Sequence, residues 1–106
     1  IKALLKPTGQ VLCLIKPQFE AGKDKVGKKG VVRDPETHRE VLDMFVALAH
    51  ELGFRILGLT FSPVKGPEGN IEFLGHLSLC DVPEVCPDTA QIVAQAHNTL
   101  DKGAEQ

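Results

Sequence analysis

The chain has 106 residues, a formal net charge of −2, and hydrophobic and charged fractions of 42% and 25%. This length allows one domain at most, and the composition is typical of an ordinary soluble globular protein. The net charge argues against a nucleic-acid binder that works by bulk charge. No apolar run approaches the ~20 residues of a membrane-spanning helix, so we expect no membrane partner.

The chain begins at Ile1, without a methionine or a signal-like segment, which suggests a piece of a longer protein. Its three cysteines, Cys13, Cys80 and Cys86, show no Cys-x-x-Cys spacing, so neither a disulfide framework nor a zinc site is indicated. The four histidines are scattered without a ligand pattern, and we expect no metal site. These features favour a reducing, cytoplasmic location.

The first two elements in chain order are a helix end and a strand. Residues 1–6 (IKALLK) are expected to be the last turns of a helix, because Pro7 and Gly9 are common just beyond a helix end. Residues 10–16 (QVLCLIK) form a continuous apolar run, which is typical of a buried central strand of a parallel sheet. Pro17 ends the strand, because proline cannot donate to a ladder.

A long loop and a helix follow. Residues 18–33 are rich in glycine and lysine, and a connection of this length is usually functional or mobile. Asp34 as the cap and Pro35 at the first position predict the start of a helix. Gly53 supplies the left-handed residue that ends it. The apolar stripe of this helix consists of Val41, Leu42, Phe45, Leu48, Ala49 and Leu52.

Two more strands are predicted at residues 54–61 and 70–79, with a turn-rich loop between them. The strand at 10–16, the helix and the strand at 54–61 predict a right-handed βαβ unit. The last two strands should pair antiparallel, because the loop that joins them is too short for a crossover helix. Residues 88–100 predict a short amphipathic helix. Few elements cover this small sheet, so we expect half of a larger α/β sheet.

Two polar residues stand at the ends of predicted strands. Lys16 closes the strand at 10–16, and ligands of open α/β sheets bind beyond the carboxyl ends of the strands. Lys16 could act as a base or direct its charge at a phosphate, or it could mark where the strand reaches water. Glu72, between two apolar residues, could hold Lys16 in place or accept from a substrate hydroxyl. It could equally lie on the exposed face of a half-buried strand.

The long loop carries a group of basic side chains that is either a solvated loop or a phosphate-facing patch. These residues are Lys23, Lys25, Lys28, Lys29 and Arg33. Glycines in the same loop would let backbone amides approach a phosphate. Asn70 could hydrogen-bond a ribose or the backbone, although turn propensity explains it equally well. Neither a GxGxxG motif nor a P-loop is present in the sequence.

Three motifs carry a resemblance to a known family. They are KPQFE, GVVRDP and GPEGNIE, and they lie within a stretch from about residue 11 to residue 77. With them the chain resembles the C-terminal part of TlyA-type (hemolysin-like) ribosomal RNA methyltransferases of the FtsJ-like family. The resemblance implies an α/β fold, the C-terminal half of a Rossmann-like methyltransferase sheet, in which a βαβ unit is followed by an antiparallel strand pair. Residues 1–79 would belong to this domain, and residues 80–106 would form a linker and a short helix or tail.

The resemblance also implies an activity, S-adenosyl-L-methionine-dependent methylation of ribose 2′-hydroxyls. Such enzymes use a Lys-Asp-Lys-Glu set, in which Lys16 matches the second lysine and Glu72 the glutamate. The loop from Lys23 to Arg33, with Asn70, would then contact ribosomal RNA or a ribosomal subunit. The first lysine, the aspartate, the glycine-rich cofactor loop and an RNA-binding domain lie upstream in the family. This chain would therefore need the missing N-terminal half of its domain, and would be inactive alone.

Two other functions remain open at the level of sequence. The first is a non-catalytic RNA-binding fragment of the same ancestry, which would show no transfer even with the missing half. The second is the membrane-lytic role that the hemolysin name suggests. The sequence supports it poorly, because the predicted helix after Asp34 carries acids along with its bases and has a core-type stripe.

Overall fold

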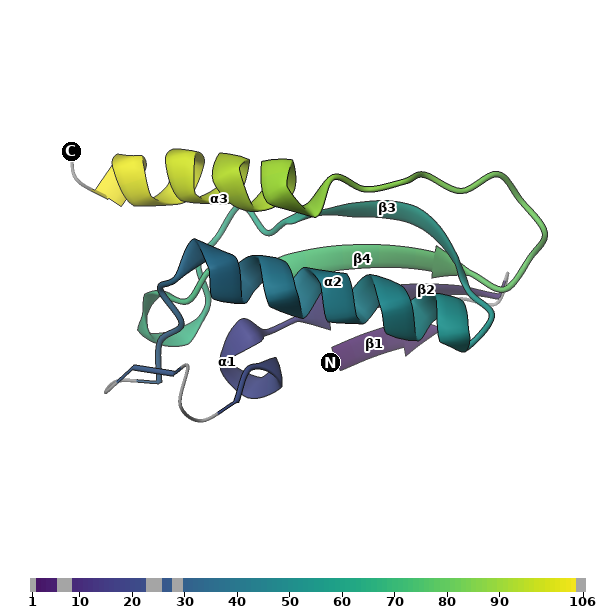
Figure 1. The fold of residues 1–106 in the computed structure, drawn as a ribbon, viewed down its shortest axis with the longest axis horizontal. Coiled ribbons are helices and arrows are strands. Elements are labelled where there is room, and N and C mark those ends of the chain that lie inside the picture. Colours follow the sequence, from purple (N-terminus) through teal and green to yellow (C-terminus); the bar gives the residue numbers. More distant parts are fainter. Residues whose placement is uncertain (1, 6–8, 23–25, 28–29, 105–106) are drawn as a thin grey trace.

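The computed structural model describes residues 2–5, 9–22, 26–27 and 30–104 of the chain. Strands and helices pack in two layers, and Figure 1 shows α2 lying across the sheet with α3 running beside β3. The elements are β1 (Lys2–Leu5), β2 (Gln10–Ile15), α1 (Pro17–Glu20), α2 (Pro35–Glu51), β3 (Arg55–Phe61), the 3₁₀ turn η2 (Pro67–Gly69), β4 (Phe73–Ser78) and α3 (Thr89–Ala104).

The described strands form one sheet of four, in the order β1-β2-β4-β3, and every neighbouring pair is antiparallel. Because β2 and β3 both run opposite to β4, they run parallel to each other, with α2 between them in the chain. The predicted strand–helix–strand unit and the antiparallel pairing of the last two strands are therefore confirmed. The insertion of β4 between β2 and β3 was not predicted, and the expectation of parallel neighbours for β2 was wrong. A continuous apolar run indicates burial, which does not fix the direction of the adjacent strands.

The start of the chain also differs from the sequence prediction. The helix expected at residues 1–6 is wrong, because β1 pairs with β2 from Lys2 opposite Leu14 to Leu5 opposite Val11. Gly9 has a φ of 78°, which suits the turn between the two strands. Proline and glycine mark tight turns as readily as helix ends, so this punctuation was ambiguous. Pairing with β2 satisfies backbone groups that four residues of helix would leave open.

The prediction for α2 is confirmed at both ends. Asp34 caps the helix by accepting a hydrogen bond from the Glu36 amide at 3.0 Å, and Pro35 is the first helical residue. Gly53 follows the helix with a φ of 87°. The predicted helix at 88–100 is also confirmed, as α3. The predicted strand at 70–79 is confirmed only from Phe73, since the three residues before it lie outside β4.

The core lies between α2 and the sheet, and α3 closes it on one side. Its buried apolar residues are Cys13, Ile15, Val41, Leu42, Phe45, Ala49, Ile56, Ile71, Phe73, Leu77, Val93 and Ala96. The predicted stripe of α2 is confirmed except at Leu48 and Leu52, whose side chains are exposed. The Phe45 ring packs directly on Gly75, where an added Cβ would come within 2.6 Å of the ring. Glycine in β4 therefore lets α2 approach the sheet closely.

Candidate functional site

The two candidate catalytic residues lie at the same edge of the sheet. Ile15, the last residue of β2, pairs with Phe73, the first residue of β4. Lys16 directly follows Ile15 and Glu72 directly precedes Phe73, so continuing the register by one residue would place them opposite each other. Directly opposed residues project on one face of a sheet with their Cβ atoms ~5 Å apart. The ends of β2 and β4 thus bring together two residues that are far apart in sequence.

The carboxylate of Glu72 is held in a narrow slot. The residue is 6% exposed, and its Oε2 accepts a hydrogen bond from Gln18 Nε2 at 3.0 Å. Gly66 forms the floor of the slot, because an added Cβ there would lie only 2.8 Å from Glu72 Oε1 and closer still to the rest of the carboxylate. The Gly66 amide donates to the Asn70 carbonyl at 2.7 Å, which fixes this floor. The alternative that Glu72 lies on an exposed strand face is therefore wrong.

Gln18, on the short helix α1, is the second wall of the slot. The sequence prediction treated residues 18–33 wholly as loop, but Pro17 starts a helical turn in which the amides of Phe19 and Glu20 donate to the Lys16 carbonyl. This turn aims the Gln18 amide nitrogen at Glu72. It leaves Gln18 Oε1 buried without a hydrogen-bond partner among the described residues. An unsatisfied buried acceptor costs about 1–3 kcal/mol, so the site has an open position for a donor.

The side chain of Lys16 is half-buried and leans on an aromatic ring. Its Nζ lies 5.9 Å from the centroid of the Phe19 ring, which is itself 75% exposed. Among the described residues no ion pair joins Lys16 to Glu72. The structure therefore brings the two residues to one edge without an ion pair between them.

The remaining predicted site residues fall into three groups. Asn70 is 2% exposed; its Oδ1 accepts from the Val32 amide and its Nδ2 donates to the Gly30 carbonyl, both at 2.9 Å. It thereby fastens the end of the long loop to the turn before β4. Arg33, directly beyond, is exposed. The four lysines predicted to contact RNA, Lys23, Lys25, Lys28 and Lys29, lie outside the described residues.

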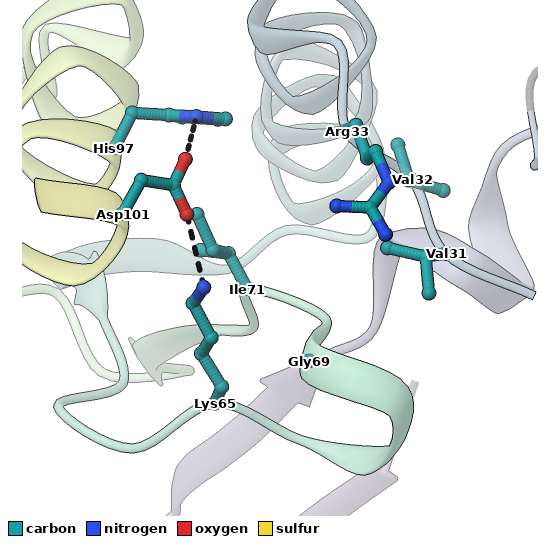
Figure 2. A pocket seen from close by; sticks show the side chains of 8 residues that line it. All are labelled: Val31, Val32, Arg33, Lys65, Gly69, Ile71, His97 and Asp101. Atoms are coloured by element: carbon teal, nitrogen blue, oxygen red, sulfur yellow. Dashed lines mark hydrogen bonds and ion pairs between the residues drawn. The ribbon is translucent and has the colours of Figure 1, made fainter. Parts of the chain in front are cut away.

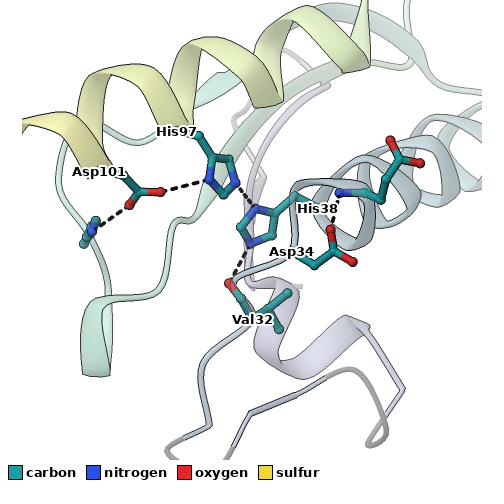
Figure 3. Close-up of polar contacts among 7 residues, drawn as sticks. Val32, Asp34, His38, His97 and Asp101 are labelled. Carbon is teal, nitrogen blue, oxygen red and sulfur yellow. Dashed lines mark hydrogen bonds and ion pairs between the residues drawn. The ribbon is translucent and has the colours of Figure 1, made fainter.

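A network of polar contacts joins α2, α3 and the loop before β4 (Figure 3). The sequence prediction missed this network. His38 is 0% exposed, and its Nε2 bonds the Val32 carbonyl at 2.9 Å. His38 Nδ1 lies 2.7 Å from His97 Nε2, and His97 Nδ1 lies 2.9 Å from Asp101 Oδ2. Asp101 Oδ1 accepts from Lys65 Nζ at 3.0 Å. The two histidines are 59 residues apart, so spacing gave no signal for the pair, although His97 and Asp101 are four residues apart on one helix.

The partners of the two histidine rings limit where their protons can lie. The Val32 carbonyl only accepts, so His38 Nε2 must donate to it. In a neutral His38 ring, Nδ1 is then an acceptor. At the other end of the network, the Asp101 carboxylate faces His97 Nδ1 and also accepts.

Burial sets the protonation state of the inner histidine. Burial first, and then the neighbouring charge of His97, lower the pKa of His38 from 6.5 to about 4, although the Val32 carbonyl, Asp101 and Asp34 oppose this. At the other end burial raises the pKa of Asp101, but the hydrogen bonds from Lys65 and His97 outweigh it and hold this pKa below its usual value. Both directions fit a neutral His38 and an ionised Asp101.

The lowered pKa of His38 predicts a loss of stability in mild acid. Between about pH 6.5 and 4 the unfolded chain binds a proton that the folded chain excludes, so the contribution is present above pH 6.5 and lost as the pH falls towards 4. Its full size is on the order of 3 kcal/mol. Denaturant unfolding of the His38→Gln variant between pH 7.5 and 4.5 should show a shallower acid loss than the unsubstituted chain. The control is His76→Gln, at a histidine of β4 whose Nε2 bonds the neutral side chain of Gln10 at 2.7 Å. Equal pH slopes for the two variants would contradict the lowered pKa of His38.

Beside the contacts of His38, His97 and Asp101 lies a pocket of about 390 Å³ (Figure 2). It is lined by Val31, Val32, Arg33, Lys65, Gly69, Ile71, His97 and Asp101. Its single carboxylate, Asp101, is already engaged by Lys65 and His97. The cofactor of such methyltransferases carries a sulfonium cation, which the positive charges of Arg33 and Lys65 would repel. Its ribose needs a free carboxylate partner, and this pocket has none. Among the described residues no cluster of three or more His, Cys, Asp or Glu side chains could hold a metal ion.

Comparison with known proteins gives a consistent family. The family model of "FtsJ-like methyltransferase" matches residues 2–79. "Putative rRNA methyltransferase YqxC" of Bacillus subtilis is 42% identical over 107 residues, covering 94% of this chain and 37% of the relative. "16S/23S rRNA (cytidine-2'-O)-methyltransferase TlyA" of Mycobacterium tuberculosis is 43% identical over 63 residues, 59% of this chain and 24% of the relative.

A solved structure agrees in fold as well as in sequence. "Putative hemolysin from Streptococcus thermophilus" superposes with a TM-score of 0.84 at 45% identity and covers 97% of this chain. This chain covers 38% of that structure. The chain therefore spans well under half the length of the relatives that it matches.

Proposed function

The chain belongs to the FtsJ-like methyltransferase family, and we propose that it is the part of an S-adenosyl-L-methionine-dependent ribosomal RNA 2′-O-methyltransferase that carries Lys16 and Glu72. It would form the C-terminal half of the Rossmann-like sheet. The observation that carries the proposal is the position of Lys16 and Glu72, one register step beyond the pair Ile15 and Phe73. Residue types suited to proton transfer thus meet at the edge where ligands of α/β sheets bind.

The chemistry needs only modest help from these residues. A cofactor held by the rest of the domain would supply the methyl group on its sulfonium, as an electrophile for the ribose 2′-oxygen. Lys16 Nζ, on a flexible stem at the sheet edge, would orient the hydroxyl and, in its neutral amine form, would receive the proton to become an ammonium. Glu72, fixed by Gln18 and Gly66, supplies negative charge beside that proton. Gln18 Oε1, buried without a described partner, is an acceptor for a donor from substrate or from the rest of the domain.

In this proposal the cofactor site lies outside this chain, and the C-terminal residues are an addition to the methyltransferase domain. The pocket beside Asp101 does not fit the cofactor, so the cofactor would be held by the remaining part of the domain. Residues 1–79 belong to the methyltransferase domain in this proposal, and residues 80–106 form a C-terminal extension. Helix α3 of that extension packs on α2 and β3 and delivers His97 and Asp101 to the pocket. Asn70 acts by holding the loop that presents Arg33 and the lysines to RNA.

The test is methyl transfer by a complete enzyme that contains this chain. Ribosomal subunits from cells lacking the enzyme would be incubated with the enzyme and isotope-labelled S-adenosyl-L-methionine. We expect label in ribosomal RNA, at ribose 2′-oxygens, as read by resistance of the modified linkage to alkaline hydrolysis. RNA binding without any transfer would support the non-catalytic alternative, and label on a base would overturn the ribose assignment.

The membrane-lytic alternative rests on the name of a relative. A relative from Brachyspira hyodysenteriae bears the name "Hemolysin A". Within residues 2–5, 9–22, 26–27 and 30–104, however, no helix combines the length and the apolar character needed to cross a membrane.

A further inference from the structure

We propose that the pocket between Arg33, Lys65 and His97 binds a backbone phosphate of the RNA substrate, next to the nucleotide that is methylated. This inference rests on the proposed function, because it takes the ligand to be RNA. It concerns residues outside the Lys16–Glu72 pair, on a wall of the molecule built jointly by the long loop, the turn before β4 and α3.

The charges of the pocket favour an anion. Figure 2 shows Arg33 directing its guanidinium into the open space from one wall, with Lys65, His97 and Asp101 on the other. Asp101 forms an ion pair with Lys65 at 3.0 Å and a second contact with the His97 ring at 2.9 Å. No described residue forms a hydrogen bond or ion pair with Arg33. The lining therefore carries an excess of positive charge, and the Arg33 guanidinium is available to a ligand.

Two contacts hold the His97 ring in the pocket wall. Its Nε2 lies 2.7 Å from Nδ1 of the buried His38, and its Nδ1 lies 2.9 Å from Asp101 Oδ2. The ring therefore offers a nitrogen-bearing surface whose position does not depend on a mobile side chain.

The geometry of Arg33 fits phosphate in particular. The planar guanidinium presents paired N–H donors that match two oxygens of a phosphate, and Lys65 adds a compact charge on the facing wall. The loop that carries Arg33 is fixed, because Asn70 bonds Gly30 and Val32 just before it. With this backbone already ordered, only the arginine side chain has to lose conformational entropy on binding.

The pocket also lies beside the proposed reaction edge. Ile71, in the pocket wall, is the residue directly before Glu72. Lys65, on the facing wall, is the residue directly before Gly66, which floors the Glu72 slot. An RNA strand whose ribose reached Lys16 would therefore run past the pocket, with a phosphate close to Arg33. Such a contact fixes the register of the strand and carries no sequence information.

The test measures binding of a short single-stranded RNA of mixed sequence to the complete enzyme that contains this chain, across a series of salt concentrations. Arg33→Gln should weaken binding roughly fivefold, in line with the loss of one exposed charge contact. It should also reduce the slope of log affinity against log salt by about one, the signature of a single phosphate contact. In spectra of the chain, RNA should shift the resonances of Arg33 and the His97 ring.

The matched control is Arg39→Gln, which removes an exposed arginine of α2 that pairs with Asp43 and lies outside the pocket. It should leave both the affinity and the salt slope unchanged. Equal effects of the two substitutions, or an unchanged slope with Arg33→Gln, would overturn the phosphate pocket. If the complete enzyme transferred methyl groups but bound RNA equally well with Arg33→Gln, the phosphate pocket would be wrong and the proposed function would stand. Arg33-dependent binding in an enzyme without transfer would overturn the proposed function alone.

Discussion

Replacing Lys16 by alanine should lower the methyl-transfer rate of the complete enzyme by about 10²- to 10⁴-fold, the usual contribution of a positioned acid–base group. Lys16 stands at the end of β2, opposite Glu72 by continuation of the strand register. Its Nζ forms no ion pair with Glu72 among the described residues, so it is available to a substrate hydroxyl. Its aliphatic stem is half-buried beside an exposed ring, so truncation should cost little stability.

The measurement separates chemistry from binding. Single-turnover transfer to ribosomal RNA should fall, while cofactor affinity and RNA affinity stay nearly unchanged. Lys16→Arg keeps the positive charge but holds its proton, so it tests the role of the lysine as base. A rate as low as that of the alanine variant would indicate proton transfer, and a partly restored rate would indicate charge alone. Full activity of Lys16→Ala would refute its assignment to the reaction.

Replacing Gly66 by alanine should lower transfer about 10²-fold, the scale expected when a catalytic group is displaced by about 1 Å. An added Cβ would fall within the van der Waals envelope of the Glu72 carboxylate, 2.8 Å from Oε1. The carboxylate is the end of a flexible side chain, so it would move aside and break its contact with Gln18. The thermal midpoint should therefore change far less than the rate.

The matched control for this substitution is Gly58→Ala, in β3. A Cβ added at Gly58 meets no atom within 4 Å, and the residue has no positive φ, so neither rate nor midpoint should move appreciably. Transfer rates and thermal midpoints of the two variants would be compared in the complete enzyme. If Gly66→Ala matched the unsubstituted rate, the position of the Glu72 carboxylate would be immaterial to the reaction.

Local signals accounted for the elements that were predicted correctly. Asp34, Pro35 and Gly53 marked the ends of α2 because each acts through its own backbone or a neighbour two residues away. Strand β3 was visible as an apolar run. The order of strands was not, because the position of β4 between β2 and β3 depends on long-range pairing. Strand β1 was missed for a similar reason, since four residues show no clear period and gain their structure from β2.

The candidate site, like the fold, could be predicted only in part. Lys16 and Glu72 could be placed at one edge because both flank strand ends, and the chain reverses between neighbouring strands. Their surroundings could not be foreseen. The slot around Glu72 needs α1 folded and Gly66 in contact, and the His38–His97 contact needs α2 and α3 packed side by side. Such contacts follow from packing and have no counterpart in residue spacing.

The place of β4 in the sheet has a consequence for the order in which the chain folds. During synthesis β2 and β3 emerge before β4, yet in the described sheet β3 has no neighbour except β4. Until Ser78 has left the ribosome, β3 can be held only by its contact with α2. One of the two inner strands of the described sheet is thus the last to be synthesised, and its insertion completes the edge that bears Lys16 and Glu72. Such non-local closure slows folding and makes this half of the sheet cooperative.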